Sequence, residues 1–253
     1  MTISIITVCF NSESTIESTI QSVINQQCDN LEYVIIDGGS TDNTINIINK
    51  YKSNIDVFVS EKDRGIYDAL NKGISKATGN IIGILHADDV FKNNEVISKV
   101  LNSFIMDVDI VYGDIEYVSR ENNSKVIRYW RAGEYGEKSF KLGWMPPHTS
   151  FFLLRSCYEK YGTYSLELGT SADYELMLRM FEVYHLNAKY LPEILVSMKL
   201  GGASNASFNN RWKANRNDKK AWKINDIKPY WFTFFIKPIR KIPQFLKFRS
   251  YNS

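Results

Sequence analysis

The chain has 253 residues, of which 44% are hydrophobic and 23% charged, and its formal net charge is +3 at pH 7. This length suits one large α/β domain, or one domain with an appendage, and the composition is that of a soluble globular protein. So small a net charge does not by itself indicate a nucleic-acid-binding protein. The three cysteines, Cys9, Cys28 and Cys157, are widely spaced and odd in number, which indicates no disulfide framework and favours a reducing compartment.

The N-terminus has no basic segment and only a short apolar run, so the sequence predicts no signal peptide. The longest late apolar run, 230–236, is far shorter than the roughly 20 residues that cross a bilayer. We therefore expect a cytoplasmic protein that does not span a membrane.

Short apolar runs alternate with helical patterns along the first part of the chain. The expected elements are strands at 4–8, 33–36, 55–59, 81–85 and 110–112, and helices at 14–26, 41–51, 66–77 and 96–104. The stretch 116–142 has weak periodicity, and a strand at 151–154 and a helix at 172–183 follow it. Repeated β-α-β units predict an α/β fold with a parallel sheet and right-handed crossovers. Ligands bind such sheets beyond the carboxyl ends of the strands, so polar residues there are candidates.

Segment 37–42, Asp-Gly-Gly-Ser-Thr-Asp, directly follows an expected strand. Its two glycines permit a tight turn and a close approach of a ligand to the backbone. Ser40 or Thr41 is placed to cap the next helix, whose N-terminus favours anionic ligands. Asp37 is placed to accept a hydrogen bond from a base or a ribose. A capped turn without a ligand explains the same residues, and both interpretations stay open.

Segment 86–89, His-Ala-Asp-Asp, follows the strand at 81–85. Adjacent carboxylates repel each other unless a cation or hydrogen bonds compensate. Mg²⁺ and Mn²⁺ suit one or two carboxylates completed by water and substrate phosphates. An exposed acidic turn that caps the next helix is the alternative.

Asp173 lies in the first turn of the helix expected at 172–183. A carboxylate there gains from the helix dipole without any further role, or it serves as a general base that must reach a substrate hydroxyl. Glu175 is two positions away and so lies on another face of the helix, which argues against a paired-carboxylate site.

Five motifs in this order resemble glycosyltransferase family 2, and most of all its small bacterial members that build O-antigen, capsule or exopolysaccharide repeat units. They are TVCFN at 7–11, DGGSTD at 37–42, DRGIYDALNKG at 63–73, HADD at 86–89 and ADYEL at 172–176. The resemblance implies a GT-A fold, with a Rossmann-like and mostly parallel central sheet flanked by helices, over residues 1–205. A nucleotide-sugar half would cover about 1–113 and an acceptor half about 114–205. Residues 206–253 would form a helical, basic and aromatic C-terminal extension.

The resemblance also implies an inverting transfer of a sugar from a nucleotide-sugar donor, usually a UDP-sugar, to an acceptor hydroxyl. Asp173 would be the catalytic base, and Asp88 with Asp89 would hold Mn²⁺ or Mg²⁺. The residues implied in donor binding are Thr7, Val8, Asn11, Asp37, Gly38, Asp63, Arg64, Asn71, His86, Ala87 and Asp88. A non-catalytic nucleotide-sugar or glycan-binding protein on the same fold is the alternative, since a fold alone does not fix an activity.

Two positions differ from the family's pattern. His86 stands where the first acid of an Asp-x-Asp motif is usual, and Leu70 stands where many members carry an arginine, for which Arg64 is a candidate substitute. His148 lies in a segment similar to one near the acceptor site of these members, or in an ordinary loop. Gly201 and Gly202 resemble part of a flap over the donor, or form a plain turn.

From Lys228 onward, aromatic residues alternate with lysine and arginine, and three prolines interrupt the stretch. This composition suits the interface of an anionic membrane. It fits an acceptor glycan carried on a lipid diphosphate and a peripheral position at the inner face of the cytoplasmic membrane. Alternatively, the aromatic residues pack on the catalytic domain and the charges are solvated. The upstream motifs argue against nucleic acid as the partner.

Overall fold

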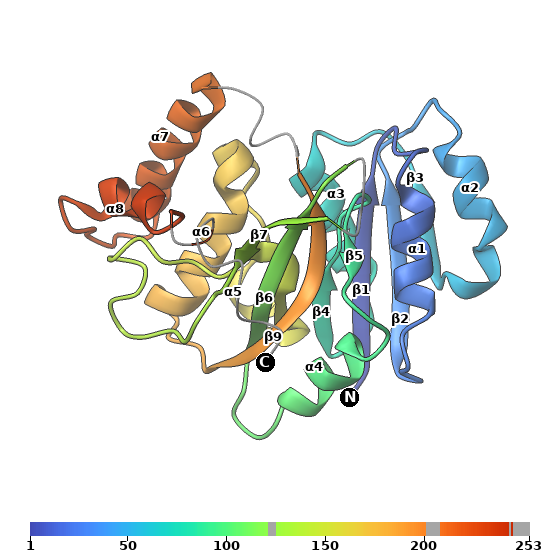
Figure 1. Cartoon of the computed structure of the whole chain (residues 1–253), viewed down its shortest axis with the longest axis horizontal. Helices are drawn as coiled ribbons and strands as arrows, with labels where there is room; N and C mark the ends of the chain where they lie inside the picture. The colour runs from blue at the N-terminus through green and yellow to red at the C-terminus, as the bar shows by residue number, and fades with distance from the viewer. Residues whose placement is uncertain (121–124, 201–207, 243, 245–253) are drawn as a thin grey trace.

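The computed structural model describes residues 1–120, 125–200, 208–242 and 244. Across these residues, one nine-stranded sheet runs through the molecule, and helices pack on both of its faces (Figure 1). One face of strand β1 (Ile3–Cys9) packs through Ile6 and Val8 against helix α3 (Ile66–Lys76). Its other face packs through Ile3 and Ile5 with helices α1 (Ile16–Ile24) and α4 (Val96–Ser103).

The first four strands confirm the predicted parallel sheet. They lie in the order β3 (Val57–Ser60), β2 (Leu31–Asp37), β1, β4 (Ile81–Ile84), and each neighbouring pair is parallel. Helix α2 (Thr44–Lys50) and the short helix η1 (Lys52–Asn54) connect β2 to β3. The predicted ends of these elements differ from the observed ones by at most three residues, because helix ends and strand ends carry weaker sequence signals than their centres.

Beyond β4 the sheet is mixed. Strand β8 (Phe151–Leu154) is antiparallel to β4 and to β6 (Ile110–Val118), and β6 continues into an antiparallel pair with β7 (Val126–Trp130). Strand β9 (Ala188–Lys199) runs parallel to β6 and pairs with the short edge strand β5 (Val90–Phe91).

Strand β9 is the main element that the sequence pattern does not predict. Pro192 and Glu193 interrupt its apolar pattern, most of its residues are only half-buried, and its register with β6 shifts near Gly113. Such an irregular strand lacks the strict alternation by which strands are recognised in a sequence.

The remaining helices all follow β7 in the chain. They are η2 (His148–Ser150), α5 (Arg155–Tyr161), η3 (Leu166–Ser171), α6 (Ala172–Leu178), the π-helical turn η4 (Arg179–Val183), α7 (Phe208–Ile224) and α8 (Thr233–Ile239). The helix expected at 172–183 is therefore present, but its last turn is π-helical.

The helices α7 and α8 lie beside α6 at one end of the molecule, with α2 at the other end (Figure 1). Trp222 of α7 is fully buried, and its Nε1–H donates a hydrogen bond of 2.8 Å to the hydroxyl of Tyr174. Thr233 of α8 donates to the carbonyl oxygen of Lys141 at 2.6 Å. The described part of the C-terminal stretch thus packs on the fold that precedes it, while Trp231 and Phe235 remain exposed.

The packing of α3 on the sheet yields a stability prediction. Gly73 lies against β1 so closely that an added Cβ would collide with the Ile6 side chain. We expect Gly73→Ala to lower the free energy of unfolding by roughly 1–3 kcal/mol, because the overpacked methyl must displace β1 or α3. Chemical denaturation measures the change.

The matched control is Gly136→Ala, since the nearest atom to a Cβ at that position is the Ser139 hydroxyl at 3.7 Å. Equal stability of the two variants would contradict the close contact between α3 and β1.

Candidate active site

The loops that follow β1 and β2 are tied together at the carboxyl end of the sheet. Asn11 has a left-handed backbone, with φ of 48°. Its N–H donates to the hydroxyl of Ser40 at 2.8 Å, and its side-chain oxygen accepts from the N–H of Thr41 at 2.9 Å. Two of the sequence motifs are therefore joined through Asn11, which holds the loop after β1 against the loop after β2.

Asp37, the last residue of β2, organises this loop from inside. Its buried carboxylate accepts hydrogen bonds from the N–H groups of Gly39 (3.1 Å) and Ser40 (3.0 Å), from the hydroxyl of Ser60 (2.6 Å), and from the hydroxyl of Ser40. Burial alone would raise the pKa of Asp37, but these donors outweigh burial and lower it. Asp37 thus shapes the loop as a carboxylate bonded by its own chain, and its contact with a donor nucleotide stays a prediction.

The third motif reaches the same loop through Asp63. A Cβ at Gly38 would collide with the carboxylate of Asp63, so only glycine permits this approach. The other oxygen of Asp63 accepts from the N–H of Gly65 at 2.8 Å. Asn11, Asp37, Gly38 and Asp63, all predicted donor-binding residues, are therefore brought together beyond the strand ends.

Four other predicted donor-binding residues make contacts within the chain. The guanidinium of Arg64 lies 2.7 Å from the carboxylate of Asp68. Asn71 donates to and accepts from the backbone of Tyr164, both at 2.9 Å, so its amide joins α3 to the segment before η3. Thr7 is buried in β1, and its hydroxyl accepts from that of Tyr33 at 3.2 Å. Val8 is buried in the core, and the donor roles of all four stay predictions.

A second group of side chains gathers around Asp173. One oxygen of this carboxylate accepts from the hydroxyl of Tyr67 at 3.3 Å and from the N–H of Tyr174 at 2.8 Å. The other oxygen lies 3.5 Å from Nδ1 of His148. Residues from α3, η2 and α6, far apart in the sequence, thus converge on the predicted base.

His148 also connects this group to the segment 86–89. The rings of His148 and His86 have centroids 5.4 Å apart. Burial lowers the pKa of His86 to about 3, and the charge of His148 acts in the same direction. His86 is therefore neutral at physiological pH, and its buried Nδ1 has no hydrogen-bond partner among the described residues.

Tyr67 is a site residue that the sequence reasoning missed. It lies inside the motif at 63–73, but only the fold shows that its hydroxyl meets a carboxylate 106 residues away. Burial, with the adjacent charge of Asp173, raises the pKa of Tyr67, so the phenol keeps its proton for donation.

The adjacent acids Asp88 and Asp89 lie in unlike environments. Asp88 is half-buried, whereas Asp89 is almost fully buried, and neither oxygen of Asp89 has a hydrogen-bond partner in the described parts of the chain. Burial raises the pKa of Asp89 well above its ordinary value, the charge of Asp88 adds to this, and the nearby Lys199 opposes it only in part. Ala87, which lies between His86 and Asp88 in the sequence, is buried as well.

An orphaned buried carboxylate beside a second one is a donor set that a hard divalent cation fits. In the described part of the chain, no group of three or more His, Cys, Asp or Glu side chains is gathered to hold an ion. An ion at Asp88 and Asp89 would therefore complete its coordination with water and substrate phosphates. Gly201 and Gly202, expected in a flap, lie outside the described residues.

A family model described as Glycosyl transferase family 2 matches residues 4–162, which is more than half of the chain. The chain belongs to this family. It is therefore a glycosyltransferase, and the expectation from its five motifs is confirmed.

Curated relatives in bacteria agree. The chain is 31% identical over 209 residues to a PGL/p-HBAD biosynthesis glycosyltransferase of Mycobacterium bovis, with 80% of this chain and 78% of that protein covered. It is 28% identical over 212 residues to the chondroitin synthase of Pasteurella multocida, where the match covers 82% of this chain but only 21% of the synthase. The shared region of this glycosyltransferase thus recurs inside a much longer protein.

Solved structures share its fold. Residues 1–349 of S. aureus TarS, in complex with UDP, superpose with a TM-score of 0.66 at 15% identity, over 90% of this chain and 67% of that one. The mannosyltransferase PcManGT from Pyrobaculum calidifontis, in complex with GDP-Man and Mn²⁺, gives 0.64 at 18% identity, over 92% and 67%. The GT-A fold predicted for this glycosyltransferase is therefore confirmed.

The isolation of Asp89 yields a prediction with a pH signature. Because its pKa is higher in the folded chain than its ordinary value of 3.8, ionisation of Asp89 costs stability as the pH rises above that value. In metal-free buffer, Asp89→Asn should raise Tm by a few degrees at about pH 8, and the gain should vanish toward about pH 4. Calorimetric melting at several pH values measures this.

The control is Asp29→Asn, which changes an exposed carboxylate on the surface. A stability loss at Asp89→Asn at about pH 8 would mean that the native carboxylate has partners and is not orphaned.

Proposed function

We propose that this glycosyltransferase is metal-dependent and inverting, and that it transfers a sugar from a UDP-sugar to a hydroxyl of an acceptor glycan carried on a lipid diphosphate. One observation carries the proposal. His148 contacts both Asp173, at 3.5 Å, and the ring of His86. The side chain of His148 therefore connects the predicted base to the predicted donor-binding segment. A base for the acceptor and a site for the departing diphosphate must be neighbours in a single displacement.

The proposed mechanism assigns the proton transfer to Asp173. The hydroxyl of Tyr67 and the N–H of Tyr174 hold one carboxylate oxygen, so the other oxygen, on the side of His148, is oriented to receive the acceptor proton. The acceptor oxygen attacks the anomeric carbon from the face opposite the nucleotide, and the bond to the diphosphate breaks. The new glycosidic bond then has the inverted configuration. His148 orients the acceptor hydroxyl beside Asp173.

Asp88 and Asp89 would hold the divalent cation. Bound there, Mn²⁺ or Mg²⁺ would supply the positive charge that offsets the negative charge on the leaving diphosphate. The neutral His86 adds no charge to the site, so the two carboxylates stay available to the cation. The carboxylate oxygens of Asp89, which have no hydrogen-bond partner in the part of the chain that the structure describes, support this assignment.

The choice of uridine rests on the five motifs. TarS was solved with UDP and with UDP-GlcNAc, and PcManGT with GDP-Man, so this fold accommodates more than one base. The loop held by Asn11 and Asp37, with Asp63 packed against Gly38, would form the nucleotide site.

Replacing the base separates catalysis from binding. Asp173→Asn should lower the rate of sugar transfer by roughly 10²- to 10⁴-fold, because an amide cannot accept the acceptor proton. Binding of the donor nucleotide, measured calorimetrically with UDP and GDP in Mn²⁺, should match that of the unchanged chain.

Asp29→Asn, on the exposed surface, is the matched carboxylate control and should keep full activity. Equal loss of nucleotide binding and transfer in Asp173→Asn would refute the base assignment. Absence of any sugar transfer by the unchanged chain, despite nucleotide binding, would favour a non-catalytic binding protein.

A membrane surface is the proposed partner of the C-terminal helices. The exposed stripe of α8 and its flanks, which we define as Trp231, Phe235, Ile239 and Ile242, has exposed fractions of 84%, 69%, 58% and 55%. Phe235 and Ile239 are four positions apart within α8 and so lie on one face of that helix, and Trp231 and Ile242 lie in the turns that flank it. Lys228, Arg240 and Lys241 lie in the same stretch and suit anionic headgroups. No helix in the described part of the chain has the length and hydropathy of a membrane span, and we propose peripheral binding at the cytoplasmic face of the membrane.

The exposed stripe predicts vesicle binding. The double variant Trp231→Ser/Phe235→Ser should weaken cosedimentation with phosphatidylglycerol vesicles by roughly tenfold or more, because two aromatic side chains no longer enter the interface. The matched control is Ile105→Ser/Met106→Ser, which removes two apolar side chains of similar exposure, 61% and 90%, from the loop after α4. Undiminished cosedimentation of the first variant would exclude this surface.

A further inference from the structure

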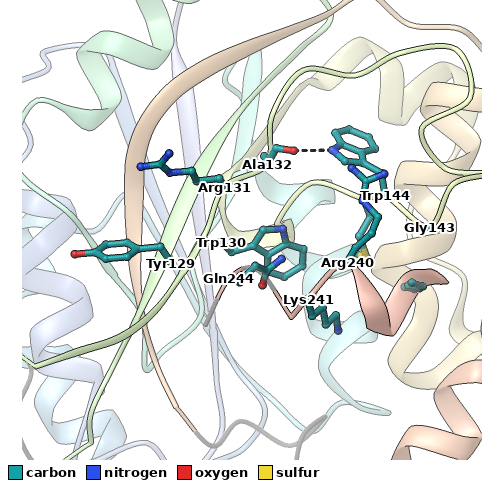
Figure 2. A pocket seen from close by; sticks show the side chains of 11 residues that line it. Tyr129, Trp130, Arg131, Ala132, Gly143, Trp144, Arg240, Lys241 and Gln244 are labelled. Atoms are coloured by element: carbon teal, nitrogen blue, oxygen red, sulfur yellow. Dashed lines mark hydrogen bonds between the residues drawn. The ribbon is translucent and has the colours of Figure 1, made fainter. Parts of the chain in front are cut away.

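A cavity of about 300 Å³ lies between β7 and α8, away from the residues placed in the active site so far. The aromatic rings of Trp130, the last residue of β7, and of Trp144, from the segment between β7 and η2, line the cavity together with Arg240 and Lys241 (Figure 2). Lys237 of α8 lines it as well. No acidic residue occurs among the described residues that line it. The cavity therefore combines positive charge with large apolar surfaces.

The aromatic side of the cavity is held in place. Along β7, Tyr129 and Arg131 extend to the side opposite Trp130, which faces the end of α8 (Figure 2). The indole N–H of Trp144 donates to the carbonyl oxygen of Ala132 at 2.7 Å. The two rings are thus fixed by the strand and by a buried hydrogen bond before any ligand arrives.

The basic side of the cavity is fixed by close packing of α8. Gly143 has φ of 75°, and a Cβ there would lie 2.7 Å from the backbone nitrogen of Lys237. The ammonium of Lys237 pairs with Asp218 at 2.6 Å, so its charge is already matched. The guanidinium of Arg240 donates to the carbonyl oxygen of Leu142 at 3.4 Å, and the ammonium of Lys241 lies 6.0 Å from the centre of the Trp130 ring.

This chemistry suits a multiply charged anion attached to an apolar or sugar group. A guanidinium and an ammonium on one rim bind phosphate oxygens through charge-assisted hydrogen bonds. Indole faces pack against hydrocarbon or the apolar face of a sugar ring. A phosphate or diphosphate ester presents both features, whereas a free carboxylate or a neutral glycan presents only one.

The cavity lies between the exposed stripe of α8 and the candidate base. Toward the base, Lys237 lies 3.5 Å above the ring of Tyr174, which is the neighbour of Asp173. Along the chain, Met145 of the cavity wall leads through two prolines to His148. Toward the surface, Ile239 and Ile242 of the exposed stripe flank Arg240 and Lys241 in sequence.

We propose that this cavity binds the diphosphate group of the acceptor, with Arg240 and Lys241 on its phosphate oxygens and Trp130 and Trp144 beside its organic part. The proposal rests on the proposed function and specifies how an acceptor anchored in the membrane is held toward Asp173. Arg240 and Lys241 are binding residues in this scheme and take no part in the proton transfer.

The test measures binding of inorganic pyrophosphate and of geranyl diphosphate to the full chain by calorimetry, at fixed ionic strength with EDTA present. Without a divalent cation, the proposed donor site does not retain diphosphates, so the probes report on the cavity. Arg240→Gln/Lys241→Gln should weaken both probes by roughly tenfold or more. Arg240→Lys/Lys241→Arg keeps the charges and should retain binding, as should Lys50→Gln on the distant helix α2.

Trp130→Leu separates the two parts of the site. It should reduce the preference for geranyl diphosphate over pyrophosphate and leave pyrophosphate binding close to that of the unchanged chain. Unchanged binding of both probes in the double glutamine variant would overturn the proposal. So would displacement of pyrophosphate by UDP in EDTA, which would locate the probe in the donor site.

Phosphatidylglycerol vesicles distinguish the acceptor from bulk lipid. If the double glutamine variant loses vesicle binding but binds pyrophosphate normally, the two cations serve the bilayer surface and the proposal fails. UDP binding in Mn²⁺ tests the donor site separately. If the unchanged chain does not bind UDP in Mn²⁺ but still binds pyrophosphate in EDTA, and the double glutamine variant loses that pyrophosphate binding, the anion site is supported. The transferase proposal then fails.

Discussion

Burial of the parallel strands β2, β1 and β4, with the half-buried strand β3 at the edge of the sheet, is the constraint from which the rest of the structure follows. Strands β3, β2, β1 and β4 are joined by crossovers that place helices on both faces of the sheet. Because every one of these strands runs in the same direction, every loop that follows a strand emerges at the same edge. Polar residues after β1, β2 and β4 therefore lie at the same edge of the sheet, even though 77 positions separate Asn11 from Asp88 in the chain.

The two buried aspartates at this edge illustrate how a fold treats a carboxylate in opposite ways. Asp37 is surrounded by donors from its own loop, which lower its pKa, and it stabilises the turn without any ligand. The carboxylate oxygens of Asp89 have no hydrogen-bond partner among the described residues, and burial raises its pKa although Lys199 opposes the shift in part. A buried carboxylate without partners is costly, and the fold retains that cost at a position where a cation and a diphosphate would remove it. The hydrogen bonds of Asp37 thus account for its burial by the structure of its own loop, whereas the carboxylate of Asp89 is the reason for proposing a cation at that position.

Sequence patterns were sufficient where structure is local. Apolar periodicity located the strands and helices up to residue 112 except the short elements η1 and β5, and it placed Asp37 at a strand end and Asp173 in a first helical turn. Sequence patterns were insufficient where packing between distant segments decides which residues form an element or a contact. The irregular strand β9 carries a proline and shifts in register, so no alternation marks it. Tyr67 and His148 meet Asp173 only because β8 returns antiparallel beside β4 and brings η2 and α6 against α3. Asn71 shows the opposite limit, since its amide is bound to the backbone of Tyr164 and serves the packing of α3.

Helix α8 connects the surface of the molecule to its catalytic interior because its two faces differ. On the outer face, Phe235 and Ile239 are exposed, an arrangement that a soluble protein retains at the cost of apolar hydration. On the inner face, Lys237 is fixed between Asp218 and the ring of Tyr174, and that ring is in turn bonded to the buried Trp222. The orientation of α8 is therefore coupled to Tyr174, the residue next to the candidate base. A chain that met its acceptor in free solution would not need this coupling. For an acceptor held in a membrane plane, as proposed, α8 would both contact that plane and set the distance of Asp173 from it.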